Sequence, residues 1–222
     1  DTLLTMSYMG TDAIVMRHSA EGAPLYATKA VDPIIINAGD GAHEHPTQAL
    51  LDMYSILEKK ESLEGLKVVI IGDIMHSRVA RSNIYGLTKM GADVHLAGPR
   101  TMVYPELEKL GVTVHHDIRE AVANADVVNV LRIQLERIHS ALYPTNREYA
   151  RIFGINNEVL KLAKDDVMVM HPGPMNRGLE IAPDVAYSDQ SVIQEQVRNG
   201  VAVRMAVLYL TIIGGDGSEL AY

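Results

Sequence analysis

The sequence predicts an α/β fold made of doubly wound parallel sheets in two domains, the first of them incomplete. Five short runs of apolar and β-branched residues lack polar alternation, which is typical of strands buried on both faces of a parallel sheet. Helical patterns separate most of these runs, as in successive βαβ units. Polar and cationic residues follow the runs, at the edge where open α/β sheets bind ligands. The five runs are residues 13–16, 34–37, 67–71, 127–131 and 167–170.

The predicted elements divide the chain into three parts. Residues 1–62 are expected to form the carboxyl-terminal part of a first domain, ending in an interdomain helix from Pro46 to about Lys60. Residues 63–190 are expected to form a second domain, with further strands near 94 and 112–115 and helices near 82–90, 106–110 and 118–124. Residues 191–222 are expected to contain one or two helices that pack back on the first domain, and Gly200 is where an interruption would fall. The apolar residues among positions 3–9 indicate the inner face of a helix.

The charge distribution favours a small anionic ligand. Asp and Glu number 28 against 20 Lys and Arg, a formal net charge of −8, and no basic stripe indicates a nucleic-acid binder. Arg17, Arg78 and Arg132 nevertheless each follow a different predicted strand. A guanidinium group can donate two parallel hydrogen bonds to a carboxylate or a phosphate. Surface ion pairs are the alternative explanation, but the equivalent placement of Arg78 and Arg132 argues against it.

The run His45-Pro46-Thr47-Gln48 lies between a predicted strand and a predicted helix. Proline suits the first turn of a helix because it has no amide hydrogen and a preset φ. His45 and Gln48 are three residues apart and would share one face, beside free backbone amides that can hold an anion. A purely structural role of His45 as a helix cap is the alternative.

Several segments together resemble the catalytic chain of aspartate transcarbamoylase. They are Arg17-His18, His45-Pro46-Thr47-Gln48, residues 72–78, Arg132-Ile133-Gln134-Leu135-Glu136-Arg137 and His171-Pro172-Gly173-Pro174. Their order and spacing match over nearly the whole chain, and the last two segments favour the aspartate-specific branch over other carbamoyltransferases. The resemblance implies transfer of a carbamoyl group from carbamoyl phosphate to the amino group of L-aspartate. The products would be N-carbamoyl-L-aspartate and phosphate, in de novo pyrimidine biosynthesis.

The resemblance also implies roles for individual residues. Arg17 and His45 would be catalytic and would address the carbamoyl carbonyl oxygen, while Gln48 would bind the carbamoyl amino group. Arg78, Arg132 and Gln134 would bind aspartate. Backbone groups of Gly173 and Pro174 would hold the carbamoyl amino end and the attacking amine. No cofactor and no metal would take part. The family forms homotrimers with shared active sites, and some members add regulatory chains or associate with dihydroorotase.

The sequence departs from the family pattern in one respect. The carbamoyl-phosphate signature Ser-Thr-Arg-Thr-Arg does not occur in it, so we expect that the segment carrying this signature is lacking at the N-terminus. Two alternatives to the aspartate enzyme stay open, although Arg132 and Gln134 argue against the first. One is a carbamoyltransferase for another amine such as ornithine, and the other is a non-catalytic aspartate-binding fragment.

Composition excludes several other classes of protein. There are no cysteines, which excludes disulfides and thiolate catalysis. No apolar run approaches the roughly 20 residues of a membrane span, and a cytoplasmic location is expected. Neither the HExxH nor the CxxC metal-binding pattern occurs, and no GxGxxG motif follows the strand at 67–71.

Overall fold

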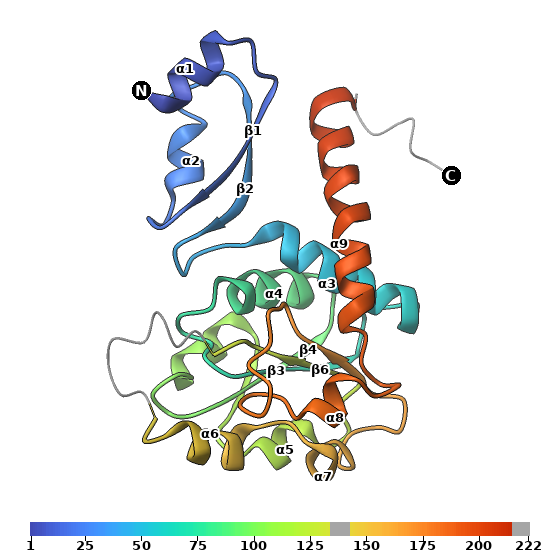
Figure 1. Ribbon diagram of the computed structural model, residues 1–222. Helices are drawn as coiled ribbons and strands as arrows, with labels where there is room; N and C mark the ends of the chain where they lie inside the picture. The colour runs from blue at the N-terminus through green and yellow to red at the C-terminus, as the bar shows by residue number, and fades with distance from the viewer. Residues whose placement is uncertain (134–142, 215–222) are drawn as a thin grey trace.

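The computed structural model describes residues 1–133 and 143–214, and within them two parallel β-sheets (Figure 1). The N-terminal sheet pairs β1 (Ala13–His18) with β2 (Ile34–Asp40). The larger sheet has the strand order β5-β4-β3-β6-β7. Its strands are β3 (Lys67–Ile71), β4 (Asp93–Ala97), β5 (Thr113–His115), β6 (Val127–Val130) and β7 (Met168–Met170). The predicted α/β class with parallel sheets is confirmed.

Helices connect the strands and cover the sheets. The N-terminal unit contains α1 (Thr2–Tyr8) and α2 (Ala23–Ala27), and α3 (Pro46–Lys60) leads from it to the larger sheet. The remaining helical elements are α4 (Arg78–Lys89), the 3-10 turn η1 (Pro105–Leu110), α5 (Ile118–Val122), α6 (Asn146–Phe153), α7 (Asn157–Leu160), α8 (Pro183–Ala186), α9 (Ile193–Leu208) and its π-helical continuation η2 (Tyr209–Ile213). Side chains cap several of these helices. Ser77 begins α4 by accepting a 3.1 Å hydrogen bond from the amide of Ala80.

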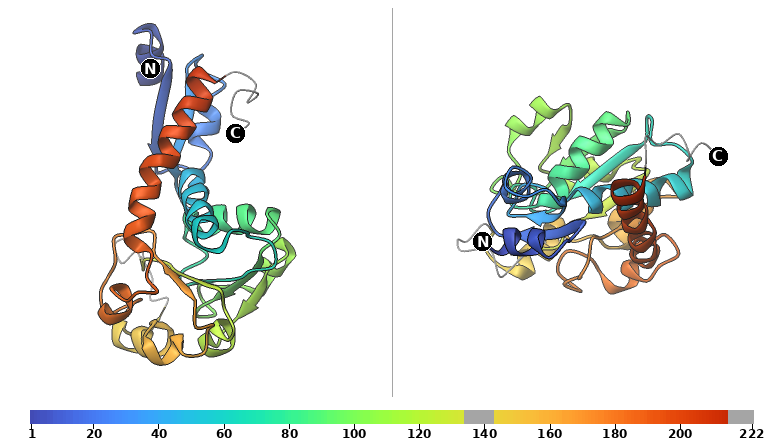
Figure 2. Two further views of the ribbon diagram at one scale, coloured as in Figure 1. Left: turned by 90° about the vertical axis from the view of Figure 1, so that its right-hand side faces the viewer. Right: turned by 90° about the horizontal axis from the view of Figure 1, so that it is seen from above.

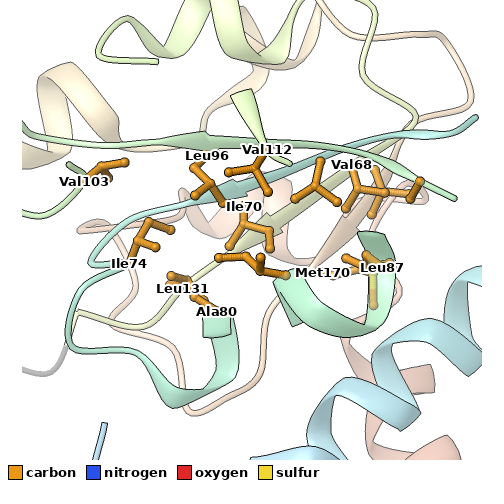
Figure 3. Close-up of a cluster of buried hydrophobic side chains, with 14 of the residues drawn as sticks. Val68, Ile70, Ile74, Ala80, Leu87, Leu96, Val103, Val112, Leu131 and Met170 are labelled. Atoms are coloured by element: carbon orange, nitrogen blue, oxygen red, sulfur yellow. The ribbon is translucent and has the colours of Figure 1, made fainter. Parts of the chain in front are cut away.

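The core lies on both faces of the five-stranded sheet. Side chains alternate along β3, so that Val68 and Ile70 belong to one apolar cluster and Val69 and Ile71 to the other. Figure 3 shows the first cluster, in which Leu87 of α4 packs towards the strands. This two-sided burial explains why the strands read as unbroken apolar runs.

Helix α9 is continuous through Gly200, so the interruption considered there does not occur. A Cβ atom at position 200 would lie 2.5 Å from Nη1 of Arg204 and 3.2 Å from Cδ2 of Leu51. Glycine therefore permits a close approach of α9 to α3 and to its own next turn. The two helices are further joined by a 3.1 Å hydrogen bond from Asn199 Nδ2 to Ser55 Oγ.

Two apolar surfaces remain exposed among the described residues. Helix α1 buries none of its residues and leaves Leu4 45% and Met6 39% exposed, so its apolar side has no partner among the described residues. The outer half of α9 projects beyond the five-stranded layer and exposes Val201 and Met205 (Figure 2). No helix within residues 1–133 and 143–214 has the length and apolar character needed to cross a membrane.

Candidate active site

A cavity of about 240 Å³ lies where the carboxyl ends of strands from both sheets meet the start of α3. Seven of the eight predicted site residues line it, although they come from five separate segments of the chain. Gln134, the eighth, lies outside the described residues. The lining consists of Arg17, His45, Gln48, Ser77, Arg78, Val79, Arg132, Pro172, Gly173 and Pro174. Three guanidinium groups around one small cavity suit a ligand with several negative charges.

The start of α3 places His45 and Gln48 in the cavity wall. Pro46 occupies the first helical position, and the backbone amide of His45 donates a 2.9 Å hydrogen bond to Ser82 Oγ of α4. Ser82 in turn donates to Glu44, which fixes this helix start against α4. The His45 side chain makes no helix-capping hydrogen bond, so the capping alternative is wrong.

The electrostatic surroundings keep His45 neutral at pH 7. Burial, followed by the positive charges of Arg78, Arg17 and Arg204, lowers its pKa from 6.5 to about 4. Its Nδ1 atom is buried and has no hydrogen-bond partner among the described residues. A neutral imidazole carries one N–H, so His45 can serve as a hydrogen-bond donor without bringing a further charge.

Arg78 is the first residue of α4 and is only 5% exposed. Its Nη1 donates to the carbonyl oxygen of Gly41 at 3.3 Å. Gly39 has φ +115°, and a Cβ atom there would lie 2.8 Å from Nε of Arg78. The guanidinium group therefore occupies space that only glycine leaves open. The Gly39-Asp40-Gly41 turn was visible in the sequence, but its contact with Arg78 was not.

Asp40 fixes the turn that carries Gly39 and Gly41. It accepts hydrogen bonds from Gly22 N at 2.6 Å, Asn37 Nδ2 at 3.0 Å and Glu44 N at 3.0 Å. Burial alone would raise the pKa of Asp40, but these hydrogen bonds and one with His43 outweigh burial and lower it to about 2. The turn thus has an ionised buried anchor at neutral pH.

The loop after β7 brings Gly173 and Pro174 to the cavity. His171, fully buried, accepts a 2.9 Å hydrogen bond at Nδ1 from the amide of Gly173, so its Nε2–H faces Glu180 at 3.2 Å. Glu180 also accepts a 2.6 Å hydrogen bond from the amide of Asn176. Sequence reasoning missed Glu180 and Asn176, because no local pattern marks a glutamate as buried.

The same network ties this loop to the segment that carries Arg132. Asn176 Nδ2 donates to the carbonyl oxygen of Ile133 at 2.8 Å, next to Arg132 in the chain. The positions of Arg132 and of the Gly173-Pro174 backbone are therefore coupled by one buried polar group, Glu180.

A second buried carboxylate was also missed. Asp52 lies one helical turn after Gln48 and accepts a 3.0 Å hydrogen bond from Gln48 Nε2. Burial raises the pKa of Asp52, against amide hydrogen bonds from Asn83, Gln196, Gln48 and Asn129 that lower it. Among the described residues, no group of three or more His, Asp or Glu side chains is placed so that it could hold a metal ion.

The two parts of the chain match the two domain models of one enzyme family. Residues 1–58 match the carbamoyl-phosphate-binding domain of aspartate/ornithine carbamoyltransferase, and residues 64–211 match its aspartate/ornithine-binding domain. The first match gives no support to the expectation that the carbamoyl-phosphate segment is lacking.

Relatives with high sequence identity carry one name. The aspartate carbamoyltransferase catalytic subunit of Desulforamulus reducens is 60% identical over 221 residues, which are 100% of this chain and 70% of the relative. That of Heliobacterium modesticaldum is 62% identical over 218 residues, which are 98% of this chain and 70% of the relative. The chain thus spans about 70% of the length of these relatives.

Solved structures of both branches of the family share the fold. Aspartate transcarbamoylase from Trypanosoma cruzi in complex with phosphate superimposes with a TM-score of 0.81 and 31% identity, over 94% of this chain and 69% of that one. Ornithine carbamoyltransferase from Pyrococcus furiosus superimposes with a TM-score of 0.82 and 30% sequence identity, over 96% of this chain and 71% of that one. The fold alone does not separate the aspartate branch from the ornithine branch. The sequence identities of 60% and 62% to aspartate carbamoyltransferase catalytic subunits place the chain in the aspartate branch. This chain belongs to the aspartate carbamoyltransferase catalytic subunit family of transferases.

Proposed function

We propose that the cavity between the two sheets is the site at which the chain transfers a carbamoyl group from carbamoyl phosphate to L-aspartate. The observation that carries this assignment is the convergence of Arg17, His45, Gln48, Arg78 and Arg132 on one cavity of about 240 Å³. Both substrates are anions that repel each other in water. Cationic and amide groups held in place can bring them together and supply much of the rate acceleration.

The carbamoyl side of the site consists of Arg17, His45 and Gln48. The aspartate amino group attacks the carbamoyl carbon, the bond from that carbon to the phosphate oxygen breaks, and the amine loses a proton. Negative charge develops on the carbonyl oxygen during the attack. Arg17 and neutral His45 donate hydrogen bonds to that oxygen, and such a donor contributes about 3–4 kcal/mol to the transition state. Gln48 receives the carbamoyl amino group.

The aspartate side consists of Arg78 and Arg132, one for each carboxylate of the substrate. Gln134 is proposed beside them and lies outside the described residues. Backbone groups of Gly173 and Pro174 hold the attacking amine and the carbamoyl amino group. The buried Glu180 links this loop to the Arg132 segment, so the two sides of the aspartate site keep a common geometry.

The charge of the site favours aspartate over ornithine as the second substrate. Ornithine would place a second ammonium group beside Arg78 and Arg132, where aspartate places a carboxylate. The test is a steady-state assay of the purified full-length protein with each amine and carbamoyl phosphate. We expect carbamoyl aspartate as the product and at least 100-fold lower kcat/KM for ornithine. A preference for ornithine would refute the assignment.

Three broader expectations complete the proposal. The enzyme acts in the cytoplasm, in de novo pyrimidine biosynthesis, and forms a homotrimer with shared active sites, to which regulatory chains or dihydroorotase could attach. Exposed apolar side chains on α9 and on the N-terminal unit support an assembly larger than a monomer, among them Val201, Met205 and Tyr26. Light scattering of the purified full-length protein tests this, and a monomeric mass would contradict it.

A further inference from the structure

We propose that Asp52 is a positioning residue for the reaction. Its buried carboxylate turns the Gln48 amide so that the carbonyl oxygen Oε1 faces the cavity, and the site thereby selects a carbamoyl N–H group over a methyl group. The inference rests on the proposed contact between Gln48 and the carbamoyl amino group, and it adds the residue that gives this contact its direction.

Asp52 is 0% exposed and is surrounded by side-chain amides. Its Oδ1 accepts hydrogen bonds from Gln48 Nε2 at 3.0 Å and Gln196 Nε2 at 2.8 Å. Its Oδ2 accepts from Asn83 Nδ2 at 2.7 Å, with Asn129 Nδ2 at 3.5 Å. These partners come from α3, α9, α4 and β6, so the carboxylate joins four elements around the base of the cavity.

The orientation of these amides follows from one backbone group. The amide N–H of His171 can only donate, and it lies 2.9 Å from Gln196 Oε1. Gln196 must therefore present its oxygen to His171 and its Nε2 to Asp52, which makes Asp52 Oδ1 an acceptor. Gln48 meets the same oxygen, and an oxygen of the ionised carboxylate can only accept, so Gln48 also has to present Nε2.

This leaves Gln48 Oε1 as the atom of the amide that can face a ligand in the cavity. A carbonyl oxygen is an acceptor only, and it can pair with the N–H of a carbamoyl group. A methyl group at the same position, as in acetyl phosphate, would leave that oxygen without a partner. A site built to hydrogen-bond a substrate N–H strongly rejects an analogue that lacks it.

Gln196 extends the effect to the opposite wall. The Gln196 side-chain amide donates to Asp52 through Nε2 and accepts from the backbone amide of His171 through Oε1. His171 is the first residue of the loop that carries Gly173 and Pro174. Asp52 therefore sets both the Gln48 amide and, through Gln196, the loop that faces it across the cavity.

The test compares carbamoyl phosphate with acetyl phosphate in the full-length enzyme. The measured quantity is the preference, given by the inhibition constant of acetyl phosphate divided by the KM of carbamoyl phosphate. Asp52→Leu keeps a similar volume but removes both acceptor oxygens, so the Gln48 amide loses the group that orients it. We expect this variant to lower the preference at least tenfold. A purely structural role would weaken both ligands equally and leave the preference unchanged, which would overturn the inference.

Ser55→Ala is the matched control. Ser55 lies on the same helix, is buried, and bonds to Asn199 of α9 at 3.1 Å, but it contacts neither Gln48 nor the cavity. This change should lower the Tm while altering the preference by less than twofold. A loss of preference as large as that of Asp52→Leu would show that loosening α3 from α9 is sufficient, and would overturn the inference.

Gln48→Ala separates the inference from the proposal on which it rests. It should remove the preference, and adding Asp52→Leu should then change the preference by less than twofold, because both changes act through one amide. An unchanged preference in Gln48→Ala would refute the proposed role of Gln48. A normal preference in Asp52→Leu, with a reduced one in Gln48→Ala, would refute the role of Asp52 alone.

Hydrogen exchange in the wild-type enzyme keeps the inference testable if Asp52→Leu does not fold. The Gln48 side-chain NH₂ resonances, assigned by their loss in Gln48→Ala, should exchange slowly because they face a buried carboxylate. Rapid exchange with solvent would place the NH₂ group in the cavity and overturn the inference.

Discussion

Replacement of His45 by alanine should lower turnover and leave unchanged the recognition of the substrates' negative charges by the arginines. His45 lies in the cavity wall beside Arg17 and Arg78, and burial together with these charges lowers its pKa to about 4. A pH of 7 lies about three units above this pKa, so roughly one molecule in a thousand carries a second proton on the His45 ring. The wild-type histidine is thus a neutral N–H donor.

The expected magnitude follows from that role. Loss of one donor to a developing oxyanion costs about 2.7–4 kcal/mol, which corresponds to a decrease in kcat of about 10²–10³. Arg17 also addresses the same oxygen, which explains why residual activity should remain. The wild-type kcat should show no inflection between pH 6 and 7 from His45, since that group titrates near pH 4.

The assay is steady-state kinetics of His45→Ala and wild type from pH 5.5 to 8.5, with both substrates saturating. His43→Ala is the matched control, because His43 lies in the same loop but bonds to Asp40 and does not line the cavity. Its kcat should stay within twofold of wild type. A kcat of His45→Ala within threefold of wild type, or a wild-type inflection near pH 6.5 that this variant removes, would refute the reasoning.

Three further predictions concern aspartate binding and stability. Arg132→Ala should remove about 2–4 kcal/mol of aspartate binding free energy, which raises the KM for aspartate about 30-fold or more and leaves the KM for carbamoyl phosphate within threefold. An unchanged aspartate saturation curve would remove Arg132 from the site. Gly39→Ala should displace the Arg78 guanidinium, since the added Cβ would lie 2.8 Å from its Nε, and should raise the aspartate KM several-fold, and normal aspartate kinetics would contradict this. His115 Nε2 and His95 Nδ1 are joined by a 2.8 Å hydrogen bond. Burial, followed by the charges of His95 and Lys67, lowers the pKa of His115. The folded protein therefore binds a proton at His115 less readily than the unfolded chain does. The contribution of neutral His115 to the free energy of unfolding is fully present above pH 6.5 and is lost as the pH falls towards the lowered pKa. The decrease in Tm between pH 7.5 and pH 5 should be smaller in His115→Gln, and an equal decrease would refute the contribution of His115.

The sequence alone determined the features that depend on neighbouring residues. Apolar runs without alternation marked the strands β3, β6 and β7, because both faces of the five-stranded sheet are buried. The runs at β1 and β2 also formed strands, although Val15 in β1 is 61% exposed. The helix from Pro46 to Lys60 has the predicted bounds, since Pro46 suits a first helical turn. The motif residues Arg17, His45, Gln48, Arg78 and Arg132 were also identifiable, because their order and spacing are properties of the chain itself.

Only the tertiary structure decided which of these residues meet and what supports them. Arg17 and Arg132 are far apart in sequence, and strand order and packing bring both to one cavity. The burial of Asp52 and Glu180 could not be predicted, since carboxylates are almost never fully buried unless they are paired, and the sequence does not show which amides would pair with them. The need for glycine at position 39 arises from the side chain of Arg78, on another element, which occupies the space of a Cβ atom. Periodicity and composition are local, whereas packing and hydrogen bonding between distant segments are set by the folded chain as a whole.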